Sequence, residues 1–158
     1  MLYEQLDRLG QRVLYHDTDS VIYIYDPLLY NIPESDTWGS WSVEKFDWKN
    51  GGIREFVGMG PKSYGLKAAN GKSFIKVKGL SLKHAHEPLL NFDVMQRTVE
   101  VYLASKQTPS VSLPQYNFAY KVGSGISTVC HFKAFMFKPE ELKGQLVGRT
   151  LFPYGYQV

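Results

Sequence analysis

The sequence predicts an α+β fold rich in antiparallel sheet, with flanking helices and a smaller C-terminal part, and three observations lead to this prediction. Short runs of β-branched and aromatic residues alternate with turn-forming residues, which is typical of antiparallel strands. Two segments repeat apolar residues at helical spacing. The chain has 158 residues, of which 44% are hydrophobic and 15% aromatic, and this is enough for one folded domain with its own core.

The N-terminal part is expected to form a helix followed by a β-hairpin. Leucines recur at helical spacing within residues 2–9, directly before Gly10, which predicts a short amphipathic helix. Residues 12–16 and 21–25 are β-branched and aromatic runs joined by the polar residues 17–20. This pattern predicts two strands and a tight turn that carries carboxylates at its tip.

Further strands and a second helix are predicted downstream of a loop. Residues 27–40 are rich in Asn, Pro, Ser, Asp and Gly, which is typical of a loop. An Asn-Gly pair at residues 70–71 is a strong signal for a hairpin turn. The expected elements are strands over 41–46, 53–57, 62–67 and 73–78, a helix over 91–104, and further short strands over 118–122 and 128–133, with a weak boundary near residue 90.

Charge is distributed unevenly along the chain, although the formal net charge is only +3. Residues 1–60 carry ten acidic and five basic residues, whereas residues 61–86 carry six lysines and no acidic residue. An acidic segment followed by a lysine-only segment suits a site in which carboxylates hold metal ions while lysines contact a polyanion.

Several classes of protein are excluded by composition. Cys130 is the only cysteine, so an internal disulfide and a thiolate zinc cluster are excluded. No apolar stretch approaches the ~20 residues of a membrane span, and the N-terminus lacks the basic-then-apolar order of a signal peptide. We therefore expect an intracellular chain in a reducing compartment, with no membrane partner.

Asp17 and Asp19 are the candidate metal ligands. Residues two apart in an extended strand point to the same side, so we expect the two carboxylates to face each other at the mouth of the hairpin. Two such charges repel, and a hard divalent cation relieves the repulsion; Mg²⁺ takes one or two carboxylates together with substrate phosphates. On its own, an Asp-x-Asp pattern is more often an ordinary turn.

Residues 15–20, Tyr-His-Asp-Thr-Asp-Ser, carry a more specific signal than the aspartates alone. They resemble Tyr-x-Asp-Thr-Asp-Ser, the third palm motif of family B DNA polymerases, at every specified position. Residues 60–65, Gly-Pro-Lys-Ser-Tyr-Gly, resemble the Lys-x-Tyr motif of that family, which contacts the primer strand near its 3′ end. Together with residues 75–79 and 150–155, their order and spacing are similar to the protein-primed, organellar and viral branch, found in adenovirus-like viruses, linear plasmids and Polinton-type mobile elements.

The resemblance implies a DNA-directed DNA polymerase that transfers nucleotides with two Mg²⁺ or Mn²⁺ ions. The implied partners are primer-template DNA, dNTP and a terminal protein primer. Asp19 is then the first candidate for a direct metal ligand and catalytic residue, and Asp17 the second. The other implied roles are primer binding for Lys62 and Tyr64, and shaping of the site for Tyr15, Thr18 and Ser20.

The resemblance also implies how much of such an enzyme the chain represents. Residues 1–90 match the C-terminal end of the palm, and residues 91–158 match a thumb-like region. A second catalytic Asp, a fingers helix that grips the triphosphate and, in most members, an exonuclease should lie before Met1. We therefore expect that the chain alone does not catalyse synthesis.

The lysines between residues 62 and 83 are candidates for contact with DNA. As a group without acids, interleaved with aromatic residues, they fit a cradle for the duplex backbone, and Lys76 and Lys78 are the further DNA-binding candidates. Each lysine taken singly is typical of a solvated sheet face.

Two alternative functions stay open. A DNA-binding module would keep the fold and the lysines without the chemistry. Residues 17–21, Asp-Thr-Asp-Ser-Val, also fit the start of haloacid-dehalogenase-type phosphatases, in which the first Asp is a nucleophile. That class needs a parallel α/β sheet and a later acidic pair.

Two further groups of residues are expected to be structural. His84 and His86 have metal-compatible spacing on a predicted strand, but no third ligand lies nearby, so we expect them at the surface. Three tryptophans are expected to pack the hairpins: Trp38, Trp41 and Trp48.

Overall fold

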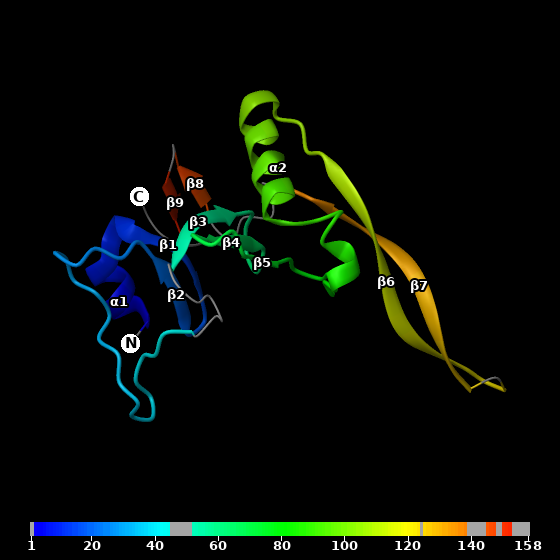
Figure 1. Ribbon diagram of the computed structural model, residues 1–158, viewed down its shortest axis with the longest axis horizontal. Helices are drawn as coiled ribbons and strands as arrows, with labels where there is room; N and C mark the ends of the chain where they lie inside the picture. The colour runs from blue at the N-terminus through cyan, green and yellow to red at the C-terminus, as the bar shows by residue number, and fades with distance from the viewer. Residues whose placement is uncertain (1, 45–51, 124, 139–144, 148–149, 153–158) are drawn as a thin grey trace.

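The structure, a computed structural model of the chain, describes residues 2–44, 52–123, 125–138, 145–147 and 150–152. Its described part contains two α-helices and several antiparallel sheets, which confirms the α+β class (Figure 1). Helix α2 lies over a central three-stranded sheet. A short hairpin with helix α1 lies at one end of the molecule, and a long hairpin projects from the other.

The predicted N-terminal helix and hairpin are both confirmed. Helix α1 spans Leu2–Leu9 and is followed by a short 3₁₀ turn. Strands β1 (Val13–Asp17) and β2 (Ser20–Tyr23) pair antiparallel, with Asp17 opposite Ser20. The Arg12 guanidinium donates hydrogen bonds to the carbonyls of Ile24 and Tyr30, which ties the loop after β2 to the base of the hairpin.

The central sheet has the strand order β3-β4-β5, with bounds Ile53–Gly58, Tyr64–Ala68 and Ser73–Lys76. The predicted Asn-Gly turn joins β4 to β5, and Gly71 adopts the positive φ of 82° that such a turn requires. The prediction of a strand over residues 41–46 is wrong for residues 41–44, the part of it that the structure describes. Trp41 makes only an isolated bridge to Glu34, so no ladder forms; residues 45 and 46 lie outside the described residues.

Helix α2 (Phe92–Ser105) confirms the second predicted helix and covers one face of the sheet. It begins at Asn91, whose side chain accepts a hydrogen bond from Val94 N at 3.0 Å and so caps the helix. Gly65 in β4 permits the close approach, because a Cβ there would lie 2.9 Å from Val57 Cγ1 and 3.0 Å from Phe92 Cδ2.

The C-terminal strands are longer than predicted. Strands β6 (Ser110–Lys121) and β7 (Gly125–Met136) form one continuous hairpin of twelve-residue strands. Pro114 and polar residues interrupt its apolar alternation, so the sequence indicates only the central pieces. A further hairpin pairs β8 (Gln145–Val147) with β9 (Thr150–Phe152).

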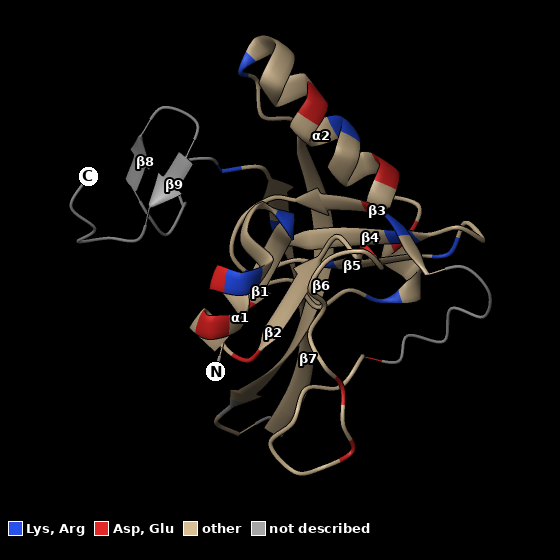
Figure 2. Cartoon of the chain, turned by 90° about the vertical axis from the view of Figure 1, so that its left-hand side faces the viewer, with Lys and Arg blue, Asp and Glu red and all other residues tan. Residues whose placement is uncertain are grey.

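One core spans the weak boundary predicted near residue 90. Its buried members come from β3, the segments next to it, α2 and the base of the β6–β7 hairpin: Val57, Met59, Leu90, Phe92, Met95, Leu113 and Phe135. The two parts therefore share a core, and their assignment to a palm and a thumb-like region stays a prediction. In Figure 2, β6 and β7 are almost entirely tan, whereas both α-helices carry charged segments of both signs.

Candidate functional site

The turn between β1 and β2 has a strained backbone. Thr18 has a φ of 54°, and Asp19 N donates to the Asp17 carbonyl at 2.6 Å, which closes a three-residue turn around Thr18. A β-branched residue seldom adopts positive φ, and such strain persists only where the surroundings impose it. The Ser20 hydroxyl also donates to the Asp17 carbonyl, at 3.0 Å. Thr18 and Ser20 therefore shape the turn, as predicted.

The two aspartates of the turn have different surroundings. Asp17 is the last residue of β1, and its side chain is 28% exposed, whereas Asp19 lies in the turn and is exposed. The expectation that both carboxylates face each other rests on strand alternation, and this basis is absent because the backbone at Thr18 is not extended. Asp17 contacts Lys62. Asp19 lines a cleft, and Asp17 is not among the residues that line this cleft.

Lys62 of the second motif lies beside Asp17. Its Nζ is 3.7 Å from Asp17 Oδ2, and Thr18 Oγ1 donates to Asp17 Oδ1 at 3.2 Å. Lys62 also has a positive φ, of 57°. Because the lysine side chain is 59% exposed, the ion pair adds little stability. Its significance is positional, since it brings together two motifs that are distant in sequence.

Two tyrosines form a second contact between the motifs. The rings of Tyr15 and Tyr64 pack with their centroids 4.8 Å apart, and the Lys62 N–H donates to Tyr15 Oη at 3.0 Å. Burial raises the pKa of Tyr15, an effect that the hydrogen bond from Lys62 partly offsets. Burial also raises the pKa of Tyr64, and the charge of Glu44 adds to the effect.

Lys62, Lys76 and Lys78 line one groove of about 360 Å³ at the end of the central sheet. The other described lining residues are apolar or glycine, so no carboxylate lines the groove, and Asp17 pairs with Lys62 from outside it. Lys67 is different, because its Nζ pairs with Asp93 at 2.9 Å, and this hydrogen bond raises the pKa of the lysine. The structure thus brings together three of the predicted DNA-binding lysines and separates them from Lys67.

Sequence reasoning missed two lysines of the adjoining surface. Lys133 in β7 and Lys138, which follows that strand, line a neighbouring hollow of about 280 Å³ together with Lys78. Lys133 Nζ donates to the Gly79 carbonyl at 3.1 Å. Only the fold reveals this proximity, because more than fifty residues separate the partners in sequence.

Asp17 and Asp19 fit only part of a Mg²⁺ site. Among the described residues, no group of three or more His, Cys, Asp or Glu side chains could hold a metal ion. Mg²⁺ commonly takes one or two carboxylates and completes its shell with phosphates and water. The two aspartates can therefore supply part of the coordination shell of Mg²⁺. They cannot supply all of its ligands.

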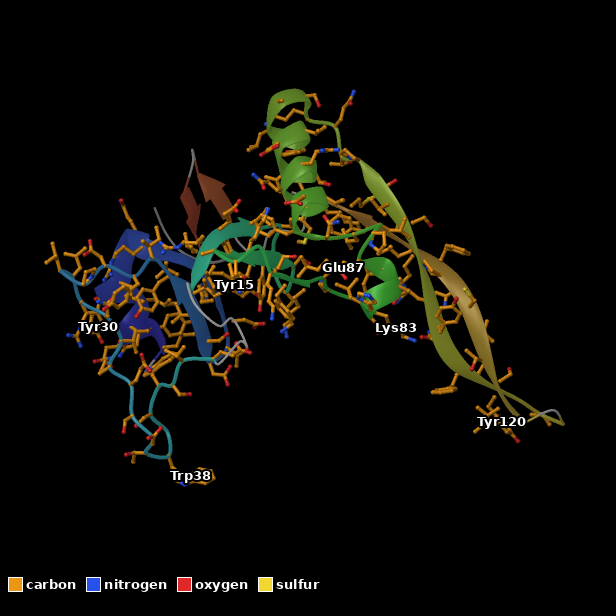
Figure 3. The ribbon with its side chains drawn as sticks, in the orientation of Figure 1. Tyr15, Tyr30, Trp38, Lys83, Glu87 and Tyr120 are labelled. Atoms are coloured by element: carbon orange, nitrogen blue, oxygen red, sulfur yellow. The ribbon has the colours of Figure 1, made fainter. Side chains whose placement is uncertain are left out.

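The histidine and tryptophan expectations need correction. His84 is exposed, as expected, whereas His86 is buried, with its Nδ1 accepting a hydrogen bond from Lys83 N. Both lie in a 3₁₀ helix (His84–His86) instead of a strand. Trp38 is fully exposed at a loop tip and packs on no hairpin (Figure 3). Trp41 is half-buried and lines the cleft that contains Asp19; Trp48 lies outside the described residues.

Comparisons with protein-family models, with curated proteins and with solved structures found no match for this chain. None of the helices in the described part of the chain is long and apolar enough to cross a membrane.

Proposed function

We propose that this chain supplies part of the catalytic and primer-binding site of a DNA polymerase that resembles the protein-primed family B enzymes. One observation carries the proposal: the Lys-x-Tyr segment contacts the segment of residues 15–20. Lys62 contacts Asp17 and, across 47 residues of sequence, Tyr15, and Tyr64 packs on Tyr15. A polymerase must hold the primer terminus beside its metal-binding carboxylates, because transfer requires the reacting groups to be in contact. The contact between the motifs supplies that proximity.

Each residue has a role that follows from its surroundings. The Thr18 hydroxyl and the Lys62 ammonium orient the Asp17 carboxylate, while Asp19 is exposed to incoming ligands. When bound, two Mg²⁺ or Mn²⁺ ions would activate the primer 3′-OH and stabilise the leaving pyrophosphate. Lys62 is well placed to move from the carboxylate to a primer phosphate, because its flexible side chain is largely exposed.

The lysine groove supports contact with nucleic acid. Lys62, Lys76 and Lys78 line it without an acidic neighbour among its described lining residues. Phosphate contacts of this kind give affinity that does not depend on sequence and that falls as salt rises. We therefore place the primer-template backbone along this groove, with dNTP at the metal ions of the Asp-Thr-Asp turn.

Two observations bear on the alternative functions. Every named strand pair in the described residues is antiparallel, which does not supply the parallel sheet that a haloacid-dehalogenase-type phosphatase needs. A DNA-binding remnant would share the groove and differ only at the Asp-Thr-Asp turn. Metal binding at the turn is therefore the property that separates these two functions.

DNA binding is tested by comparing the Lys62→Ala and Lys72→Ala variants on a 3′-recessed primer-template. Lys72 is also an exposed lysine, and it lies in the β4–β5 turn, outside the groove. We expect Lys62→Ala to weaken binding and to lower the slope of log affinity against log salt by about one, with Lys72→Ala close to wild type. Equal losses in both variants, or affinity unchanged between ~50 and 200 mM salt, would contradict the groove assignment.

Metal binding is tested by titrating the chain with Mn²⁺ in the presence of primer-template and dNTP. We expect paramagnetic broadening of the backbone NMR signals of residues 17–20, and its loss in the Asp17→Asn, Asp19→Asn double variant. If DNA binds but these signals do not broaden, the chain is a DNA-binding remnant. The chain alone is expected not to extend a primer; extension that Asp19→Ala abolishes would show that its site is complete.

A further inference from the structure

A second site lies on the Asp19 side of the β1–β2 hairpin. It is a cleft of about 390 Å³ between the hairpin, the loop that follows it and strands β3 and β4. This volume is within the usual range for small-molecule sites. The cleft is separate from the lysine groove, and no residue lines both.

The walls of the cleft are largely aromatic. Five aromatic side chains contribute, and apolar residues of β2, the loop and β4 fill the space between them. The faces of tyrosine and tryptophan rings attract cations, and the attraction strengthens where water is excluded. The aromatic lining residues are Tyr15, Tyr23, Tyr25, Trp41 and Tyr64.

The charge of the cleft is complementary to a cation. Asp19, Glu34 and Glu44 line it, and no Lys, Arg or His occurs among its described lining residues. Within the described part of the chain, the carboxylates of Asp19 and Glu34 have no hydrogen-bond or ion-pair partner. This distinguishes them from Asp17, which Lys62 neutralises.

The spacing of these carboxylates favours an organic cation over a metal ion. No three carboxylates among the described residues are close enough to share one metal. Separated charges between aromatic walls instead match a ligand that has an apolar stem and a positively charged end. A nucleic-acid phosphate is excluded by the negative charge of the lining.

We propose that this cleft binds an organic cation, an ammonium or guanidinium group on an apolar stem. The aromatic walls hold the stem, and Glu34 and Glu44 pair with the charged end. Two sources share this chemistry: a free polyamine, and a lysine or arginine side chain of a peptide. The cleft shares Tyr15, Asp19 and Tyr64 with the proposed polymerase site. The binding of the cation rests on Glu34, Glu44 and the aromatic walls and is tested without DNA or dNTP, so its failure is distinguishable from failure of the polymerase function.

The experiment titrates the full chain, without DNA, with four probes and follows the indole N–H signal of Trp41 by NMR. The signal is assigned with a Trp41→Phe variant, because the chain has three tryptophans. The probes are spermidine, a blocked arginine peptide, the same peptide with neutral citrulline in place of arginine, and Mg²⁺ alone. We expect saturable shifts with spermidine or the arginine peptide, and the tighter of the two identifies the source.

The decisive variant is the Glu34→Gln, Glu44→Gln pair. We expect it to weaken binding by roughly tenfold, because it removes two charges near the ligand. Asp36→Asn is the matched control, since Asp36 is an exposed acid of the same loop that does not line the cleft; it should bind as wild type does. Equal binding of the citrulline peptide, the same shifts with Mg²⁺ alone, no saturable shift with any probe, or equal losses in both variants would overturn the proposal.

Discussion

The hairpins β1–β2 and β6–β7 are both pairs of antiparallel strands, but different contacts hold them in place. The β1–β2 hairpin is short, and contacts from Lys62 and Tyr64 fix the position of its turn. The β6–β7 hairpin is buried only at its base, where Leu113 and Phe135 enter the core, and its far end projects (Figure 1). A turn that other segments hold can tolerate backbone strain, whereas a projecting hairpin depends on its base alone.

The largest expected effect is at the base of the long hairpin. Leu113 is fully buried, so Leu113→Ala should lower the free energy of unfolding by about 2–5 kcal/mol through lost burial and the cavity that remains. Phe118 in the same strand is 85% exposed, and Phe118→Ala should change stability by less than about 0.5 kcal/mol. Urea unfolding of both variants measures the difference, and similar losses would show that the far end is also packed.

A smaller effect of opposite sign is expected at the short hairpin. Thr18→Gly removes the side-chain penalty at a φ of 54° and should raise the free energy of unfolding by up to about 1 kcal/mol. The same change frees the Asp17 carboxylate from its hydrogen bond with Thr18, so Mn²⁺ affinity at the turn should fall. Thermal unfolding and a Mn²⁺ titration test both effects. A less stable variant would show that no strain is stored there.

The smallest effect is on the pH dependence of stability. The folded chain holds the phenol protons of Tyr15 and Tyr64 more tightly than the unfolded chain, because burial raises both pKa values above 10.0. This stabilisation is complete below pH 10 and is lost as pH rises through the folded-state pKa values. Urea midpoints at pH 8 and pH 10.5 should therefore differ less in the Tyr15→Phe, Tyr64→Phe variant than in wild type. If the difference in urea midpoint is the same in the variant and in wild type, the loss of stability at alkaline pH comes from other groups, such as Lys67, whose pKa is also raised.

The sequence predicted local elements better than their arrangement. Helix α1, the turn at residues 17–20 and the Asn-Gly hairpin follow from short-range signals, namely leucine spacing and turn-forming residues. The length of β6 and β7 did not follow, because both strands are edges of a two-stranded sheet, and an edge strand tolerates a proline such as Pro114. The 3₁₀ turn at His86 was missed because its histidine caps the backbone from within the turn.

The sequence predicted which residues belong to the candidate site, but it did not predict how they are arranged. The motifs identified Asp17, Asp19, Lys62 and Tyr64, but strand alternation does not apply to the two aspartates, because the turn begins directly after Asp17. The partners of Lys67 and Lys133 could not be predicted, since they come from α2 and from the segment after β5. Contacts of this kind depend on packing between distant segments, which no local pattern records.

The isolation of the long hairpin has a consequence for the handling of the protein. In the described residues, β6 and β7 form a two-stranded sheet, so each strand leaves its outer row of backbone N–H and C=O groups unpaired. Open edges of this length are templates onto which strands of other molecules add. Pro114 removes one donor from the β6 edge, and Lys133 adds a charge to β7, so the edges carry some protection against aggregation as the protein is concentrated.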